Sequence, residues 1–158
     1  TGPIKAGNVL DSDGTGNLAG AGGSSGTKNV GYVVMAQSEA ITQATNGSSA
    51  GVYTTGIVIP ADSQILSVTL LVTTAWTGTA STLGIGTTAS ATALTAAGAV
   101  AGGTKGVVSA NPGTVDAAIA NWKDVGTTDI QVKVTSTNTG SGVGVLTVTY
   151  IQSNSLTA

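Results

Sequence analysis

The chain contains no histidine, cysteine, arginine or phenylalanine, and charged residues make up only 8% of its 158 residues. Histidine and cysteine are the side chains that most often serve as general base, nucleophile or transition-metal ligand. Without cysteine, disulfide cross-links are also excluded. Because the usual reactive groups are missing, we predict that the chain is not an enzyme and that it has no catalytic residue, no cofactor and no metal site.

The small number of charges also limits the partners that the chain can recognise. Its net charge is −2, and its five basic residues are scattered along the sequence: Lys5, Lys28, Lys105, Lys123 and Lys133. Nucleic-acid binding normally needs a basic patch that displaces counterions from phosphates, so we expect no nucleic-acid partner. No apolar run approaches the roughly 18 residues that cross a bilayer, and the first residues do not resemble a secretory leader. We therefore expect cytoplasmic synthesis and no membrane partner.

Aromatic residues are scarce, at 3% of the chain, so the core must be built from small aliphatic side chains. Each fully buried Val or Ile contributes roughly 1.5–3 kcal/mol to stability, and a buried alanine contributes much less. A chain of this composition gains from a second source of burial. We therefore predict a homo-oligomer.

Glycine, threonine, alanine and serine make up over half of the chain, and glycine is concentrated near its start. Residues 14–26 read GTGNLAGAGGSSG, which offers little side chain for packing. We therefore divide the chain into a flexible, extended N-terminal arm (1–30) and a β-sandwich domain (31–158). The arm is either a passive tail or a strap that becomes ordered on a partner, and its apolar anchors are Ile4, Val9, Leu10 and Leu18.

From residue 30 onward, short runs rich in Val, Ile and Thr alternate with Gly- and Pro-marked turns. We predict strands at 32–36, 52–59, 64–74, 80–86, 106–109, 128–136 and 143–151. Residues 90–97 favour a short helical turn, and helix is otherwise scarce. This pattern predicts an all-β fold, an antiparallel β-sandwich that is jelly-roll-like, with a barrel as the alternative.

The run at residues 64–74, QILSVTLLVTT, alternates most clearly. The alternation separates two sets of side chains, of which one is uniformly apolar. We predict that this apolar set faces the core: Leu66, Val68, Leu70 and Val72.

Several short motifs match functional patterns but lack the partners that those patterns need. Residues 22–26 and 47–51 both fit G-x-S-x-G, yet a serine nucleophile needs a base, normally histidine. Asp11 and Asp13 begin a stretch that resembles a calcium loop, but Gly22 stands where the bidentate acid belongs. We interpret that stretch as a solvated turn. Likewise, Asp62 is interpreted as a turn acceptor and Asp129 as a charge at a strand edge.

Trp76 and Trp122 are the largest side chains, and each has two interpretations. An exposed tryptophan can stack on a sugar ring or anchor a protein interface. A buried one closes an end of an aromatic-poor core, which is the interpretation we favour. Trp76 stays among the candidate contacts because it follows the strongest strand.

Residues 55–76, TGIVIPADSQILSVTLLVTTAW, resemble the cement or decoration proteins that stabilise the heads of tailed bacteriophages. The strand at 82–87, TLGIGT, and the terminal VLTVTYI at 145–151 are similar to the same group. The resemblance spans roughly residues 50–152 and does not include residues 1–30. It implies a β-sandwich, usually trimeric, that binds the outer face of the capsid lattice. Related patterns in head fibres and tail-spike tips imply an alternative, a receptor- or glycan-binding module.

From the composition and the resemblance together, we predict a virion structural protein on the capsid surface. It binds the major capsid protein and stabilises the contacts between neighbouring capsid subunits. Repeated capsid sites would let a trimer bind through several copies at once. The residues predicted to contact the partner are Ile4, Val9, Leu10, Leu18 and Trp76.

Overall fold

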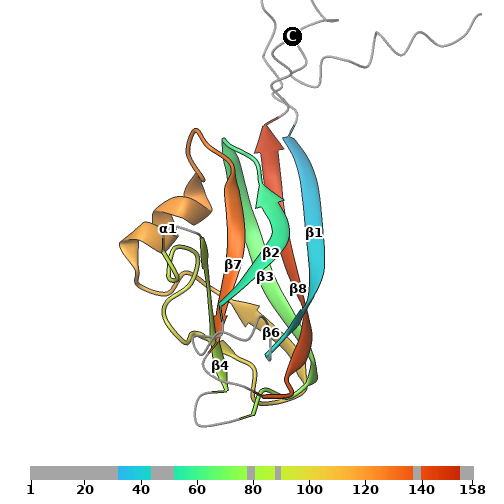
Figure 1. Cartoon of the computed structure of the whole chain (residues 1–158). Helices are drawn as coiled ribbons and strands as arrows, with labels where there is room; N and C mark the ends of the chain where they lie inside the picture. The colour runs from blue at the N-terminus through green and yellow to red at the C-terminus, as the bar shows by residue number, and fades with distance from the viewer. Residues whose placement is uncertain (1–31, 44–51, 78–80, 88–89, 137–139, 154–158) are drawn as a thin grey trace, which may run out of the picture.

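The computed structural model describes residues 32–43, 52–77, 81–87, 90–136 and 140–153. Within these residues the chain forms two four-stranded β-sheets and one α-helix (Figure 1). The elements, in chain order, are β1 (Tyr32–Thr42), β2 (Val52–Ile59), β3 (Ser63–Thr74), β4 (Thr82–Thr87), β5 (Val100–Ala101), β6 (Gly106–Ala110), α1 (Asp116–Lys123), β7 (Ile130–Ser136) and β8 (Val143–Ser153).

The first sheet has the strand order β1-β8-β3-β6, and the second has the order β2-β7-β4-β5. All the pairings are antiparallel. Each strand also pairs with the strand equally far from the other end of the series: β1 with β8, β2 with β7, β3 with β6 and β4 with β5. A long hairpin rolled into two layers gives this nesting. The prediction of an all-β, antiparallel β-sandwich is therefore confirmed.

The core lies between the two sheets and consists mainly of small aliphatic side chains, as the composition predicts. Val68, Leu70, Leu146 and Val148 come from the middle of the first sheet, and all are almost completely buried. Side chains of the second sheet face them, and Trp76 closes the cluster. Regular alternation along the strands therefore places one apolar face of each sheet against the other.

The predicted inward set of β3 is wrong at one position. Val68, Leu70 and Val72 are buried, but Leu66 is 43% exposed and Ile65 is buried in its place. The register between β3 and β8 shifts between Ile65 and Ser67, which is the mark of a β-bulge. Because a bulge inserts one extra residue, it reverses the alternation on its N-terminal side.

The structure also corrects the predicted helix. Residues 90–97 form turns instead, and their backbone is tied to β4: the N–H groups of Leu94 and Thr95 both donate to the carbonyl of Ile85, at 3.1 and 2.9 Å. The helix lies at α1, which the sequence analysis missed. Its first turn carries Asp116 and its last turn Lys123, the arrangement that suits the helix dipole.

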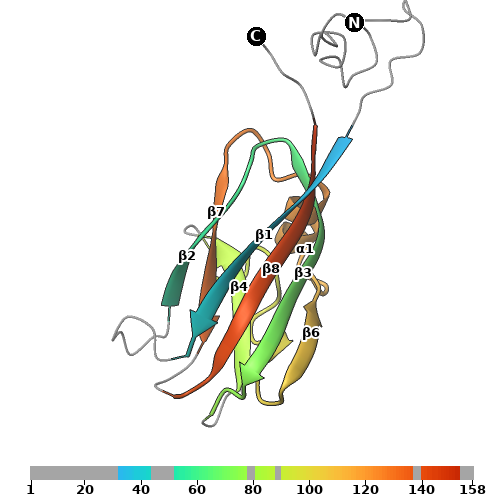
Figure 2. The same ribbon diagram turned by 90° about the vertical axis from the view of Figure 1, so that its right-hand side faces the viewer.

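Both ends of the described sandwich domain lie at the same end of the molecule. Tyr32, which begins β1, pairs with Ser153, which ends β8 (Figure 2). The β2–β3 turn lies at this end as well, since Ser63 pairs with Gln152. Among the described residues, no helix has the length and apolar character needed to span a bilayer.

Candidate interaction surfaces

Four of the five predicted contact residues, Ile4, Val9, Leu10 and Leu18, lie outside the described residues. The same holds for the calcium-like stretch that begins at Asp11. Among the residues that the structure does describe, no group of three or more acidic side chains is placed to hold a metal ion.

Trp76, the fifth candidate, belongs to the core and not to the surface. Its side chain is only 3% exposed. Three glycines make room for the ring, because a Cβ atom at Gly102, Gly142 or Gly144 would lie 3.1, 2.5 or 3.2 Å from its nearest ring atom. Within the described part of the chain, the indole Nε1 has no hydrogen-bond partner. A partner could reach Trp76 only by opening this end of the sandwich, so the interpretation as a core residue replaces that of a surface contact.

Trp122 does not offer an exposed ring platform either. It is partly buried, and its Nε1 donates to the carbonyl of Leu94 at 2.8 Å. The neighbouring Asn121 donates from Nδ2 to the carbonyl of Ala93, also at 2.8 Å. Helix α1 therefore uses two consecutive side chains to hold the 90–98 loop in place.

The outward side of the first sheet carries no charged side chain. Alternation of burial along the strands places these residues on it: Val34, Ala36, Ser38, Ala40, Thr42, Gln64, Leu66, Ser67, Thr69, Leu71, Thr73, Val107, Ser109, Val143, Val145, Thr147, Thr149 and Ile151. We call this surface the uncharged face. Glu39, the one charged residue in the strands of this sheet, alternates to the inward side and is partly buried.

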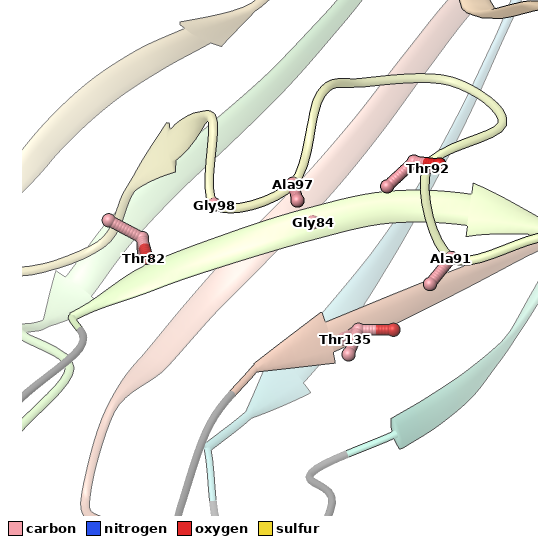
Figure 3. Close-up of a pocket in the computed structure, with 7 residues that line it drawn as sticks. All are labelled: Thr82, Gly84, Ala91, Thr92, Ala97, Gly98 and Thr135. Carbon is pink, nitrogen blue, oxygen red and sulfur yellow. The ribbon is translucent and has the colours of Figure 1, made fainter.

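The outward side of the second sheet is different, because it is partly covered. The 90–98 loop crosses β4, so that Gly84 is buried although its strand neighbours Leu83 and Ile85 point into the core. Between the loop and the sheet lies a small hollow of about 180 Å³ (Figure 3). It is lined by Thr82, Gly84, Ala91, Thr92, Ala97, Gly98 and Thr135. These side chains are small, and none of them can act as an acid, a base or a strong metal ligand.

Polar side chains of β1 fasten the two sheets along the edge where β1 and β2 meet. Gln37 accepts from the N–H of Val58 at 3.1 Å, and its Nε2 donates to the carbonyl of Val58 at 2.6 Å and to the Tyr150 hydroxyl at 2.8 Å. One residue past the end of β1, Gln43 makes the same double contact with the backbone of Thr77, in the segment that follows β3. We call this row, with Glu39 between the two glutamines, the polar seam.

Glu39 is the charged member of the polar seam. One carboxylate oxygen accepts from the Tyr53 hydroxyl at 2.7 Å, and the other accepts from the backbone N–H of Gly56. The pairing between β2 and β7 is interrupted between Thr54 and Val58, so Glu39 replaces ladder contacts at this point. The hydrogen bond to Glu39 raises the pKa of Tyr53, and burial and the negative charge add to the effect. Both carboxylate oxygens of Glu39 are therefore occupied by structural hydrogen bonds.

Carboxylates at the end where β1 begins support turns. Asp129 accepts from the N–H of Ala61 at 2.9 Å, which ties the β2–β3 turn to the start of β7. Asp124 accepts from the N–H of Gly126 at 2.8 Å. Asp62 has a positive φ of 56°, a conformation that Asp tolerates better than most residues. Asp62 thus lies in the turn where it was predicted, and Asp129 acts as a turn acceptor beside its strand.

A chain in the solved structure described as the cyanophage Pam1 capsid asymmetric unit has a similar fold. The two chains are 26% identical, and the match has a TM-score of 0.50. It covers 76% of this chain and 84% of the capsid chain. No family model matches the sequence, and no curated protein matches it. The likeness supports a phage structural protein that resides in the virion.

Proposed function

We propose that the protein decorates the outer surface of a phage head, where it binds the major capsid protein and stabilises contacts between neighbouring capsid subunits. The observation that carries the proposal is the shared fold with a chain of a phage capsid asymmetric unit. The match includes most of both chains, so the likeness concerns the whole sandwich and not one hairpin.

The surface chemistry of the described residues is consistent with a structural role. The hollow on the second sheet is lined by small side chains, and Glu39 is occupied by Tyr53 and Gly56. What the sandwich offers instead is broad sheet surface. Such a surface can bind through area and repetition without a reactive centre.

In this proposal, the N-terminal arm is a strap that lies along neighbouring capsid subunits. The first described strand, β1, begins at Tyr32 and lies at an edge of the first sheet. A strap that precedes it would therefore not need to cross the sheet. Its anchors would be Ile4, Val9, Leu10 and Leu18. Several copies, three as the sequence resemblance implies, would bind a repeating lattice with more avidity than one.

Removal of residues 1–30 tests the strap. We expect the shortened protein to keep its sandwich, with an unchanged circular dichroism spectrum, but to stop cosedimenting with undecorated heads. The matched control is full-length protein in which the four anchors are replaced by serine, which keeps the length of the arm and removes its apolar groups. We expect that variant to lose binding as well. If the shortened protein decorates heads with undiminished affinity, the strap is wrong.

The alternative, a receptor- or glycan-binding module of a head fibre or tail tip, needs an exposed aromatic platform. Trp76 is buried, and the ring nitrogen of the partly buried Trp122 is bonded to Leu94. No feature of the described residues favours this alternative over capsid decoration.

A further inference from the structure

We propose that the uncharged face of the first sheet packs against a second copy of the same chain. This inference concerns the isolated protein in solution and does not depend on the proposed role at the capsid. It specifies the surface through which the expected oligomer forms. Neither the sequence nor the comparison locates that surface.

The strand register shows how the uncharged face is organised. One apolar row crosses all four strands: Ala40 pairs with Val145, Val145 with Leu71, and Leu71 with Val107. Leu71 is 44% exposed and Val107 is 70% exposed, so the row is open to solvent in the single chain.

A row of hydroxyl side chains runs beside the apolar row. Ser38 pairs with Thr147, Thr147 with Thr69, and Thr69 with Ser109. The Ser38 and Thr147 hydroxyls are hydrogen-bonded to each other at 2.7 Å. A hydroxyl both donates and accepts hydrogen bonds, so such a row can pair with an identical row in any orientation. The uncharged face is therefore complementary to itself in composition.

The absence of charge separates this face from the rest of the described surface. An antiparallel sheet that faces water normally carries polar and charged side chains on that side. The second sheet has Lys133 on its partly covered side, and α1 carries Asp116 and Lys123. Depletion of charged residues is the compositional mark of the buried centre of an interface. A strongly charged partner would find no complement here.

The size of the face also fits contact between subunits. Three of the strands carry five outward rows each and β6 carries two, so at a strand spacing of about 4.8 Å the face covers roughly 500 Å² before side-chain relief is counted. A standard interface buries about 800 Å² on each partner, and crystal-packing contacts usually bury less than about 400 Å² on each. The face is thus large enough to form most of a specific interface.

A second copy is a better occupant than the arm of the same chain. The arm offers only four large apolar side chains, Ile4, Val9, Leu10 and Leu18, spread over fifteen residues of mostly small side chains. A second copy supplies an equal area of matching rows. It also supplies the extra burial that a core with few aromatic residues needs.

The test uses the full-length protein and measures its mass in solution by light scattering and sedimentation equilibrium. Because a face that packs against the same face of another copy forms a two-fold pair, we expect wild type to have twice the 15.1 kDa chain mass, in place of the trimer that the sequence resemblance implies. Leu71→Lys and Val107→Lys should each weaken association by at least about tenfold, because each buries an unpaired charge in the contact. The matched control is Ile119→Lys on α1, where the side chain is 46% exposed, and we expect its oligomer to be unchanged. Circular dichroism checks that each variant is folded.

A second measurement does not depend on the lysine variants. The chain has no cysteine, so Leu71→Cys and Ile119→Cys each introduce a unique thiol. In the oligomer, maleimide should react much more slowly with the thiol at position 71 than with the one at position 119. Dilution to the monomer should remove the difference. Deleting residues 1–30 should leave the protection in place.

Three results would overturn the proposal. The first is a wild-type protein that is monomeric at about 100 µM, a concentration at which even weak specific dimers associate. The second is an oligomer that neither lysine substitution weakens. The third is protection of position 71 that disappears when residues 1–30 are removed, which would identify the arm as the occupant.

Discussion

The outward sides of the two sheets differ in how far they are covered and in charge. The second sheet is covered in part by the 90–98 loop, which α1 holds through Asn121 and Trp122. Among the described residues, nothing comparable covers the outward side of the first sheet, and the strand residues on that side carry no charge. The contrast is the reason why we propose that the first sheet is buried between chains.

The sheets also differ in how their strands are joined. In the first sheet, β1 and β8 pair over eleven consecutive positions without a shift. In the second, the pairing between β2 and β7 breaks at Thr54, and side chains of the polar seam take over. The β1–β8 pair is therefore held by an unbroken ladder, whereas the β2–β7 pair depends more on particular side chains.

The largest loss of stability should come from truncating one core side chain in each of two regions, the middle of β8 and the loop that covers β4. Leu146 lies in the middle of β8, and Leu94 lies in the loop that covers β4, yet both are completely buried. We expect Leu146→Ala and Leu94→Ala each to lower the free energy of unfolding by about 2–5 kcal/mol, measured by urea denaturation. A cost below about 1 kcal/mol for Leu94→Ala would mean that the loop is not part of the core, which would break the comparison.

The next largest loss of stability should come from filling the space that three glycines leave for the ring of Trp76. A Cβ atom at position 142 would lie 2.5 Å from Cδ2 of the ring. Gly142→Ala should therefore force the ring to shift and destabilise the protein by about 1–3 kcal/mol in the same denaturation assay. In a Trp76→Leu background the same substitution should cost much less, because the ring that it displaces is absent. Equal costs in both backgrounds would contradict the assigned contact.

A smaller loss of stability is expected from substitutions in β1. The loss should be larger on the inward side, at the polar seam, than on the outward side. Glu39→Ala leaves the Gly56 N–H and the Tyr53 hydroxyl without their acceptor, so it should destabilise the protein by about 1–3 kcal/mol. Ser38→Ala, one residue away on the uncharged face, should cost no more than about 0.5 kcal/mol in the monomer. If Ser38→Ala costs as much as Glu39→Ala, the seam is not what joins the sheets at this edge.

The smallest effect is the titration of Tyr53. Because its pKa is raised, the neutral phenol is favoured in the folded protein. The stability that this group contributes is fully present below the unfolded value of about 10 and is lost as pH rises through the folded value. The difference in tyrosinate absorbance near 295 nm between wild type and Tyr53→Phe should show Tyr53 ionising at a higher pH than a free tyrosine. Glu39→Ala, which removes the acceptor, should move that titration toward lower pH, and no movement would argue against the hydrogen bond as its cause.

Much of this architecture follows from alternation and turn residues in the sequence. The strands at 52–59, 106–110 and 143–153 lie close to their predicted bounds, because Val, Ile and Thr alternate there and Gly or Pro punctuates the ends. Two-residue β5 is too short to leave such a pattern. Helix α1 was missed because its eight residues are few for a periodic signal, and tertiary contacts with the 90–98 loop help to fix it.

The surface features were harder to predict, because they depend on how separate strands align. The bulge that exposes Leu66 is a property of the pairing with β8 and not of the β3 sequence. The uncharged face becomes visible only once four strands are placed side by side. The sequence favoured a core position for Trp76 but kept it as a candidate contact, and its burial follows from the glycines of distant segments that make room for its ring.

Electron cryomicroscopy of intact phage particles that carry this chain tests the central claim most directly. The account predicts density for this sandwich on the outer surface of the head, in contact with the major capsid protein, with the uncharged face turned toward another copy. Heads whose outer surface lacks such density, with the chain found at the tail tip or missing from the particle, would contradict it.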